Sequence, residues 1–458
     1  MITPLTRLFG STLLTLAALA ALPTFSCAAD PHEYVLSNGM KVLLVEVPKA
    51  PVATVQVWYK VGSRNEVMGR AGLSHMLEHM MFKGTTRYPK GVFSRLIRKN
   101  GGVDNAFTSQ DFTAYFENLA ADRVELALDM EADRMQGLLL DNAEFQTERE
   151  VVKEERRMRN EDDPQGALVE ALFAQAFQSH PYHWPIIGWF PDLDAMSLDD
   201  LQRHYDTYYS PNNATLVVVG DIKADALLPV IKRHFEPIPR GPAPKPLLAV
   251  EPEQHGERRF VLKRDTQVPF VMMGFRGPNY ASDDAYALDM LESILSHGKS
   301  ARLYQNLVYQ QNLALAVGAD SGVMQTDPGL FYLYALVSPG AKVDAVEAAL
   351  EQEISRLQSE PPSELELQRA RNQVEAAHVF EQDSNFRRAM LLGQMESIGA
   401  GWQKADQFLE RIRSVTAKDV QRVAKQYLRP DNRTVGILLP QPAKSAEPQT
   451  ATAHEGKS

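Results

Sequence analysis

The sequence predicts an α+β fold in which one domain occurs twice. Three observations support this prediction: a helix–turn–strand pattern recurs late in the chain, strand-like runs and long amphipathic helices occur in both halves, and a proline-rich connector separates the halves. The chain has 458 residues, which suits two or three domains, and its 44% hydrophobic and 23% charged residues are typical of a globular protein. These values exclude a disordered chain, a collagen-like repeat and a coiled coil.

The expected elements follow one another in a similar order in the two halves. Each half opens with strand-like runs, and longer amphipathic helices come after them. The predicted strands cover 42–47, 52–59, 259–263 and 269–275, and two of the predicted helices cover 122–139 and 343–358. Strands mixed with paired helices favour an α+β domain.

The repeat consists of two segments that match at one constant spacing. Five identities share it: Asp200 with Asp419, Gln202 with Gln421, Arg203 with Arg422, Pro211 with Pro430, and Thr215 with Thr434. Each segment reads as a helix opened by Ser197 or Thr416 as N-cap, followed by a turn and a buried strand. We therefore predict a tandem duplication of a domain of roughly 200 residues.

A proline-rich stretch separates the two copies. Five prolines within residues 236–246 predict a stiff, extended connector, because proline cannot continue a helix or a central strand. The predicted organisation is a signal peptide over 1–29, a first domain over 30–236, a linker over 237–252, a second domain over 253–441 and a disordered tail over 442–458.

The N-terminus has the layout of a secretory signal. Arg7 precedes an apolar run over 8–22, and Pro23 and small residues follow it. The run is short for a membrane span, although an uncleaved anchor helix is the alternative. Cys27 is a second alternative, as a lipid attachment site, which the preceding Thr-Phe-Ser disfavours. We expect a protein exported to the periplasm of a Gram-negative bacterium, without a stable membrane span.

Charge and cysteine content limit the possible partners and metal sites. The formal net charge of -10 argues against a nucleic-acid partner, because no excess of Lys and Arg is present to neutralise phosphates. The single cysteine excludes an intrachain disulfide framework and a zinc ribbon. Any metal site therefore has to be built from His, Asp and Glu.

The strongest local motif contains His75, Glu78 and His79. Their spacing places all three side chains on one face if the segment is helical. Two imidazoles one turn apart can bind one Zn²⁺, and the carboxylate between them can take a proton from water. The alternative is an amphipathic helix without a metal, and the motif requires a third ligand in either case.

A second segment offers carboxylates for that ligand. Asp141 or Asn142 can cap a helix on which Glu148 and Glu155 lie seven residues apart, with Glu154 about 100° away from Glu155. An apolar stripe is predicted from Phe145, Val151, Val152 and Met158, with both carboxylates near its middle. Burying them requires a positive charge, which a metal would supply. The alternative is a surface helix of mixed charge, with Arg149, Arg156 and Arg157 as partners.

Together these motifs resemble those of the pitrilysin-type metallopeptidases. The His-x-x-Glu-His order is the inverzincin motif, and the Glu-Arg-Glu-Val-Val-x-x-Glu run matches the family's downstream segment. The chain is most similar to the short-chain branch, which includes mitochondrial processing peptidase and exported bacterial homologues. The resemblance implies two homologous domains, each a mostly antiparallel sheet with packed helices, that face each other as a clam shell.

The resemblance also implies roles for individual residues. His75, His79 and Glu155 become the ligands of one Zn²⁺ per chain, Glu78 the general base, and Glu148 an auxiliary carboxylate. Residues 100–109 resemble the family's edge strand, onto which a peptide substrate adds as an extra strand; its substrate-binding residues are Asn105, Ala106 and Thr108. An ordinary hairpin edge is the alternative for this segment.

The second copy departs from the family's catalytic pattern. Asp289 and Ser293 stand where His75 and His79 stand in the first copy, so no zinc site of this kind is expected there. Self-sufficient members carry an Arg and a Tyr in this half, but Phe331 lies where the Arg is expected. Arg302 and Tyr304 open a predicted helix and are assigned a structural role. His180 and His183 are assigned to a packed loop rather than to a second metal site.

The predicted function is a zinc-dependent endopeptidase that acts on extended or unfolded peptides. Because the Arg/Tyr pair is missing, we expect this chain to be the zinc-bearing subunit, with a homologous partner subunit or a second copy of itself completing the site. The alternative is a zinc-containing peptide-binding or scaffold subunit with little activity alone.

Overall fold

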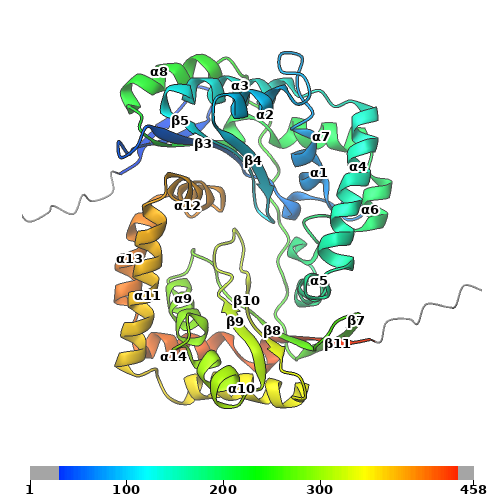
Figure 1. The fold of residues 1–458 in the computed structure, drawn as a ribbon, viewed down its shortest axis with the longest axis vertical. Coiled ribbons are helices and arrows are strands. Elements are labelled where there is room, and N and C mark those ends of the chain that lie inside the picture. The colour runs from blue at the N-terminus through cyan, green and yellow to red at the C-terminus, as the bar shows by residue number, and fades with distance from the viewer. Residues whose placement is uncertain (1–29, 442–458) are drawn as a thin grey trace, which may run out of the picture.

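Residues 30–441 of the computed structural model form two mixed sheets, each packed with helices, which confirms the predicted α+β class. The two halves face each other, with the first sheet at the top and the second at the bottom of the molecule (Figure 1). The expected signal peptide over 1–29, with Cys27, and the expected tail over 442–458 lie outside the described residues.

The first sheet has six strands in the order β1-β2-β6-β3-β5-β4. The strands are β1 (His32–Val35), β2 (Lys41–Glu46), β3 (Val52–Tyr59), β4 (Val103–Thr108), β5 (Thr113–Ala120) and β6 (Ala214–Gly220). Only β2 and β6 run parallel, and the other neighbours are antiparallel. Strand β4 is bonded to β5 alone, so its other edge is free.

The second sheet repeats this arrangement with five strands. They are β7 (Arg258–Arg264), β8 (Phe270–Arg276), β9 (Ala314–Asp320), β10 (Leu330–Val337) and β11 (Arg433–Pro440). Their order, β7-β11-β8-β10-β9, is that of β2-β6-β3-β5-β4, and the parallel pair β7/β11 corresponds to β2/β6. The duplication expected from the sequence is therefore present in the topology.

The repeated sequence segments form the same local structures. Helices α7 (Leu198–Tyr208) and α14 (Ala417–Tyr427) begin with the predicted N-caps Ser197 and Thr416, and each N-cap is part of a capping box. After each helix, the side-chain amide of Asn213 or Asn432 donates a hydrogen bond of 2.9 Å to the carbonyl of the last helical residue. The same hydrogen bond from an asparagine side chain to the backbone thus connects the helix to the following central strand in each copy.

The remaining helices cover the sheets. In the first half they are α1 (Leu73–Met80), α2 (Val92–Lys99), α3 (Val124–Gly137), α4 (Asn142–Arg156), α5 (Pro164–Ala176), α6 (Phe190–Ala195) and α8 (Ala224–Phe235). In the second half they are α9 (Asp284–Ser296), α10 (Val343–Ser359), α11 (Glu364–Gln382), α12 (Asn385–Ser397) and α13 (Gln403–Ser414). No helix within residues 30–441 has the length and hydropathy needed to span a membrane.

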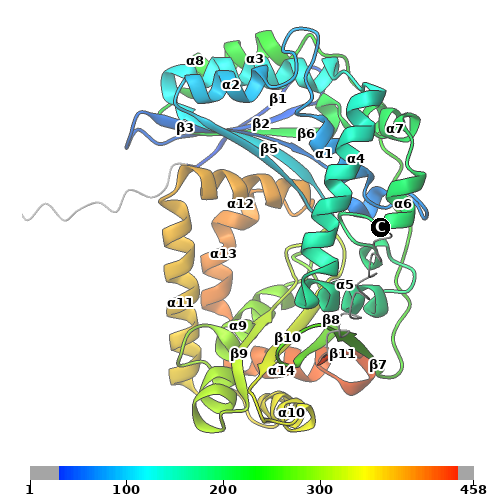
Figure 2. The same ribbon diagram turned by 45° about the vertical axis from the view of Figure 1, so that its right-hand side comes forward.

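The two halves exchange one helix each. Helix α12 of the second half packs on β3 and β6 of the first sheet, and α5 of the first half packs on β8 and β11 of the second (Figures 1 and 2). Trp58 shares a buried cluster with Leu392 of α12, and Leu168 of α5 shares another with Leu438. Because each sheet is covered by a helix of the other half, the two halves form one interlocked unit.

A glycine allows the close contact between α12 and the first sheet. A Cβ atom added to Gly393 would lie 2.2 Å from the indole ring of Trp58, which is fully buried. We expect Gly393→Ala to lower the free energy of unfolding by about 1–3 kcal/mol, because the helix or the indole has to move. The measurement is chemical denaturation, with Gly256→Ala as control, since nothing lies within 4 Å of that position. Equal midpoints for the two variants would contradict this account.

Candidate active site

Helix α1 presents His75, Glu78 and His79 on one face. A Cβ atom on Gly72, the N-cap with φ +94°, would lie 2.6 Å from the carbonyl oxygen of Ile187, so only glycine allows this helix to start here. The Glu66 carboxylate accepts the N–H groups of Gly72 and Ser74, both at 2.7 Å. An acidic group at a helix N-terminus is favourable, and this one fixes the orientation of α1.

Helix α4 brings the third candidate ligand to this face. Asp141 is its N-cap, as one of the two predicted alternatives, and accepts the N–H of Glu144. An oxygen of Glu155 lies 3.7 Å from Nε2 of His75, and the other lies 3.3 Å from Nε2 of His79. The three residues form a group whose possible ligand atoms all lie within 4.8 Å of one another.

The apolar stripe expected on α4 is only half correct. Phe145 and Val152 are buried, but Val151 and Met158 are exposed. Glu148 and Glu155 therefore lie at the edge of the buried face and not at its middle. At this edge α4 contacts α1. The error arises because a periodic pattern gives the angles between side chains but not the side on which the rest of the protein packs.

The positively charged residues next to Glu148 and Glu155 are not the three arginines that the surface-helix alternative predicts. Arg149, Arg156 and Arg157 pair with Gln146, Glu170 and Glu154 respectively. Glu148 instead contacts Lys83 and accepts a 2.9 Å hydrogen bond from Nδ1 of His79, and Glu155 pairs with Arg159 at 2.9 Å. Glu154 points away from the site, with 59% of its side chain exposed, which excludes it as the alternative ligand.

The charges of the site favour a bound cation. Burial, assisted by the neighbouring His79, lowers the pKa of His75 to about 4, so its imidazole is neutral. Burial also acts to lower the pKa of His79, but the hydrogen bonds to Glu148 and Glu155 outweigh it and raise this pKa to about 9. The hydrogen bond from His79 lowers the pKa of Glu155. A positive charge is therefore held between two carboxylates.

A zinc ion fits this donor set. Two imidazoles and one carboxylate are a ligand set found in catalytic zinc sites, which leave a fourth position open. Nδ1 of His79 is bonded to Glu148, which orients Nε2 toward the other donors in the way of an outer-shell carboxylate. Zinc bound here would take the place of the proton on His79.

The site opens into a cavity of about 720 Å³. Its lining includes Glu78 and the predicted substrate-binding residues Asn105, Ala106 and Thr108 of β4. The Thr108 hydroxyl donates a hydrogen bond to the Glu78 carboxylate, and burial raises the pKa of Glu78. The proposed base and the free edge of the sheet thus share one cavity.

The second half contains no comparable site within the described residues. Asp289 is hydrogen-bonded to Tyr280 and Ser321, and Phe331 is completely buried in the core. Arg302 pairs with Glu366, in agreement with the structural role expected for it. His180 is buried and bonded to Asp327, and Nδ1 of His183 lies 2.8 Å from the His180 carbonyl, so both belong to a packed loop.

Several residues around the site escaped the sequence analysis. Glu66, Lys83 and Arg159 fix α1 or neutralise the carboxylates, and Thr108 was assigned to the substrate rather than to Glu78. Arg159 lies on a π-helical turn over Arg157–Glu161, four residues after Glu155. The i,i+4 spacing was the only available signal for that pair.

Comparisons with known proteins agree with this geometry. Residues 41–188 match the family model described as insulinase (peptidase family M16), and residues 195–374 match the peptidase M16 inactive domain. The chain is 32% identical to zinc protease PqqE of Helicobacter pylori, over 95% of this chain and 98% of that protein. It is 28% identical to an uncharacterized zinc protease of Mycobacterium leprae, over 90% and 93% of the two chains.

Solved structures show the same relationship. The crystal structure of a protease from Helicobacter pylori superimposes with a TM-score of 0.87 at 32% identity, covering 90% of this chain and 99% of that one. A chain of complex III2 from Candida albicans reaches a TM-score of 0.76 at 19% identity, covering 89% and 95%, which shows the fold alone. The active-site motif, the duplicated fold and these relatives establish that the chain belongs to the M16 (pitrilysin/insulinase) family of zinc metalloproteases.

Proposed function

We propose that the chain is an endopeptidase that hydrolyses extended or unfolded peptides, with one zinc ion held by His75, His79 and Glu155. The proposal rests on one observation: these three residues and Glu78 line the same cavity, which is bordered by the free edge of β4. A metal store would not need a general base or a peptide-binding edge beside the metal.

Each residue of the site has a role in peptide hydrolysis. Zinc held by His75, His79 and Glu155 would supply a Lewis acid able to polarise the scissile carbonyl and to lower the pKa of water. Glu78 takes a proton from the attacking water and later delivers it to the leaving nitrogen. The raised pKa of Glu78 suits both steps, and the hydrogen bond from Thr108 holds its carboxylate in place. Glu148 keeps His79 oriented through Nδ1.

The substrate adds to β4 as a further strand. Free backbone groups on an edge strand bind any extended peptide, which makes recognition largely independent of sequence. The lining of the cavity also includes apolar and aromatic side chains: Val169, Phe173, Trp184, Ile186 and Ile187. These residues favour bulky apolar side chains in the substrate next to the zinc.

A second subunit completes the catalytic site in this proposal. Every described residue that lines the cavity lies between His75 and Ile187, so the second half adds no Arg or Tyr to it. We propose that a homologous partner or a second copy of the chain supplies them. The charged, apolar and small-residue regions at the N-terminus support export to the periplasm.

The first test replaces the proposed base. In Glu78→Gln the amide cannot accept the proton of water, so we expect peptide hydrolysis to fall by roughly 10²- to 10⁴-fold while zinc remains bound. Cleavage of a quenched-fluorescent, unstructured peptide and metal analysis of the same sample measure the two effects. Normal hydrolysis by this variant would rule out the mechanism.

The second test concerns the metal ligand on α4. We expect Glu155→Gln to lose zinc on dialysis, with a greater drop in affinity than the roughly 10- to 100-fold of an outer-shell change. Glu154→Gln is the matched control, because this neighbouring carboxylate is exposed and pairs with Arg157. Zinc contents that fall equally in both variants would show that the assignment is incorrect.

The third test asks whether the chain is complete by itself. After size fractionation, we expect the monomer to bind zinc without appreciable turnover, and hydrolysis to appear only in fractions that contain a dimer or a homologous partner. Peptide cleavage with and without a zinc chelator, together with the measured mass of each fraction, decides the matter. Chelator-sensitive turnover by the monomer would remove the need for a partner.

A further inference from the structure

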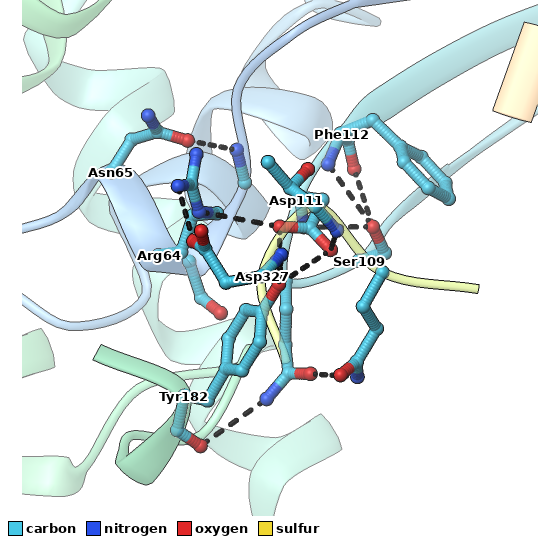
Figure 3. A network of polar contacts seen from close by, with 12 residues as sticks. Arg64, Asn65, Ser109, Asp111, Phe112, Tyr182 and Asp327 are labelled. Atoms are coloured by element: carbon cyan, nitrogen blue, oxygen red, sulfur yellow. Dashed lines mark hydrogen bonds and ion pairs between the residues drawn. The ribbon is translucent and has the colours of Figure 1, made fainter. Parts of the chain in front are cut away.

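One loop of the second half is built into the first half beside the catalytic site. It connects β9 to β10 over residues 321–329, and Asn279 of its own half braces it with hydrogen bonds to the carbonyls of Gln325 and Thr326. Figure 1 shows this loop rising from the second sheet toward β4. Its tip meets the turn that follows β4 (Figure 3).

Asp327 occupies the centre of this contact. Its carboxylate pairs with Arg64 and lies 3.0 Å from Nε2 of His180, while its backbone N–H donates to the Tyr182 hydroxyl at 3.1 Å. Arg64, His180 and Tyr182 all belong to the first half. Asp327 is therefore bound to two separate segments of the catalytic half.

A buried carboxylate of the first half depends on the same network. Asp111 is 5% exposed, and burial raises its pKa. It lies 3.3 Å from Nε of Arg64 and accepts hydrogen bonds from the Tyr182 hydroxyl and from the N–H of Thr326 (Figure 3). A buried carboxylate requires such partners, and one of them comes from the second half.

We infer that Asp327 is a positioning residue for the catalytic site, so that the half without zinc ligands sets the geometry of the half with them. The inference rests on the proposed function for the roles of Glu78 and β4. Two structural connections lead from Asp327 to the reacting groups.

The first connection runs through the turn between β4 and β5. Asp111 lies in this turn, and the Ser109 hydroxyl accepts the N–H groups of Asp111 and Phe112, both at 3.1 Å. Thr108, the last residue of β4, directly precedes the turn and donates to Glu78. A displacement of the turn therefore moves both the substrate edge and the partner of the general base.

The second connection runs through the short helix over Ser63–Asn65. The backbone N–H of Arg64 donates to the Gln110 carbonyl at 2.9 Å, so the short helix and the turn are joined. Glu66 follows immediately and binds the N-terminus of α1 through its carboxylate. The ion pair between Arg64 and Asp327 thus also acts on the helix that carries His75 and His79.

A general stabilising role does not account for this contact. The exchanged helices α5 and α12 already join the halves through large buried clusters. Another ion pair between the halves, Lys49 with Asp383, is exposed, and neither residue lines the cavity. Asp383→Asn is therefore a matched control that removes one carboxylate between the halves without touching the network.

The test is Asp327→Asn in the full chain, in the oligomeric state that hydrolyses peptides. Arg64 keeps Asp111 as a partner in this variant, so we expect the fold to be retained. We expect kcat to fall roughly 10- to 100-fold, as for a small misplacement of reacting groups, with zinc content and melting temperature close to those of Asp383→Asn. Wild-type kcat in Asp327→Asn would overturn the inference, as would an equal loss in both variants.

A double-mutant cycle identifies the route of the effect. Thr108→Val removes the hydrogen bond to Glu78, so its effect on kcat and that of Asp327→Asn should be strongly non-additive if both act through β4. Additive effects would contradict the connection through the turn.

A readout independent of turnover separates this inference from the proposed function. We expect faster amide hydrogen exchange over residues 103–112 in Asp327→Asn than in Asp383→Asn. If no form of the chain hydrolyses peptides, the proposed function fails, and the exchange rates still decide whether Asp327 positions β4. Unchanged exchange in this segment would overturn the positioning role.

Discussion

The face shared by α1 and α4 imposes one requirement on the catalytic half: two carboxylates and two imidazoles have to occupy a small, largely buried space. Glu148 and Glu155 are each within hydrogen-bonding range of His79, and Lys83 and Arg159 approach from the sides. Like charges this close are tolerated only if positive charge lies between them. The cap on α1, the start of α4 and the free edge of β4 are arranged around this requirement.

The duplicated copies differ in chemistry, since only the first carries such a site among residues 30–441. Both copies keep the capping boxes, the turn asparagines and the strand order, because these features specify the fold. The metal-binding face does not specify the fold, and in the second copy Asp289 has become a buried partner of Tyr280 and Ser321. The residues that are identical in the two copies therefore specify backbone geometry and not metal binding.

The part of the site that lies on a single helix could be predicted from the sequence. The spacing of His75, Glu78 and His79 defines a face by helix period alone, and the location of Glu155 followed from a resemblance. Contacts between distant segments were not predictable. The exposure of Val151, the pairing of Lys83 and the docking of Asp327 depend on which surfaces meet, and no local pattern contains that information.

The exchange of α5 and α12 has a consequence for the order in which the chain folds. Strand β11, the last one, lies between β7 and β8, so the second sheet cannot close until residues 433–440 have been synthesised. Until then α5 lacks β11, one of the two strands of the second sheet on which it packs most extensively. Folding of the second half is therefore completed only after synthesis of nearly the whole chain.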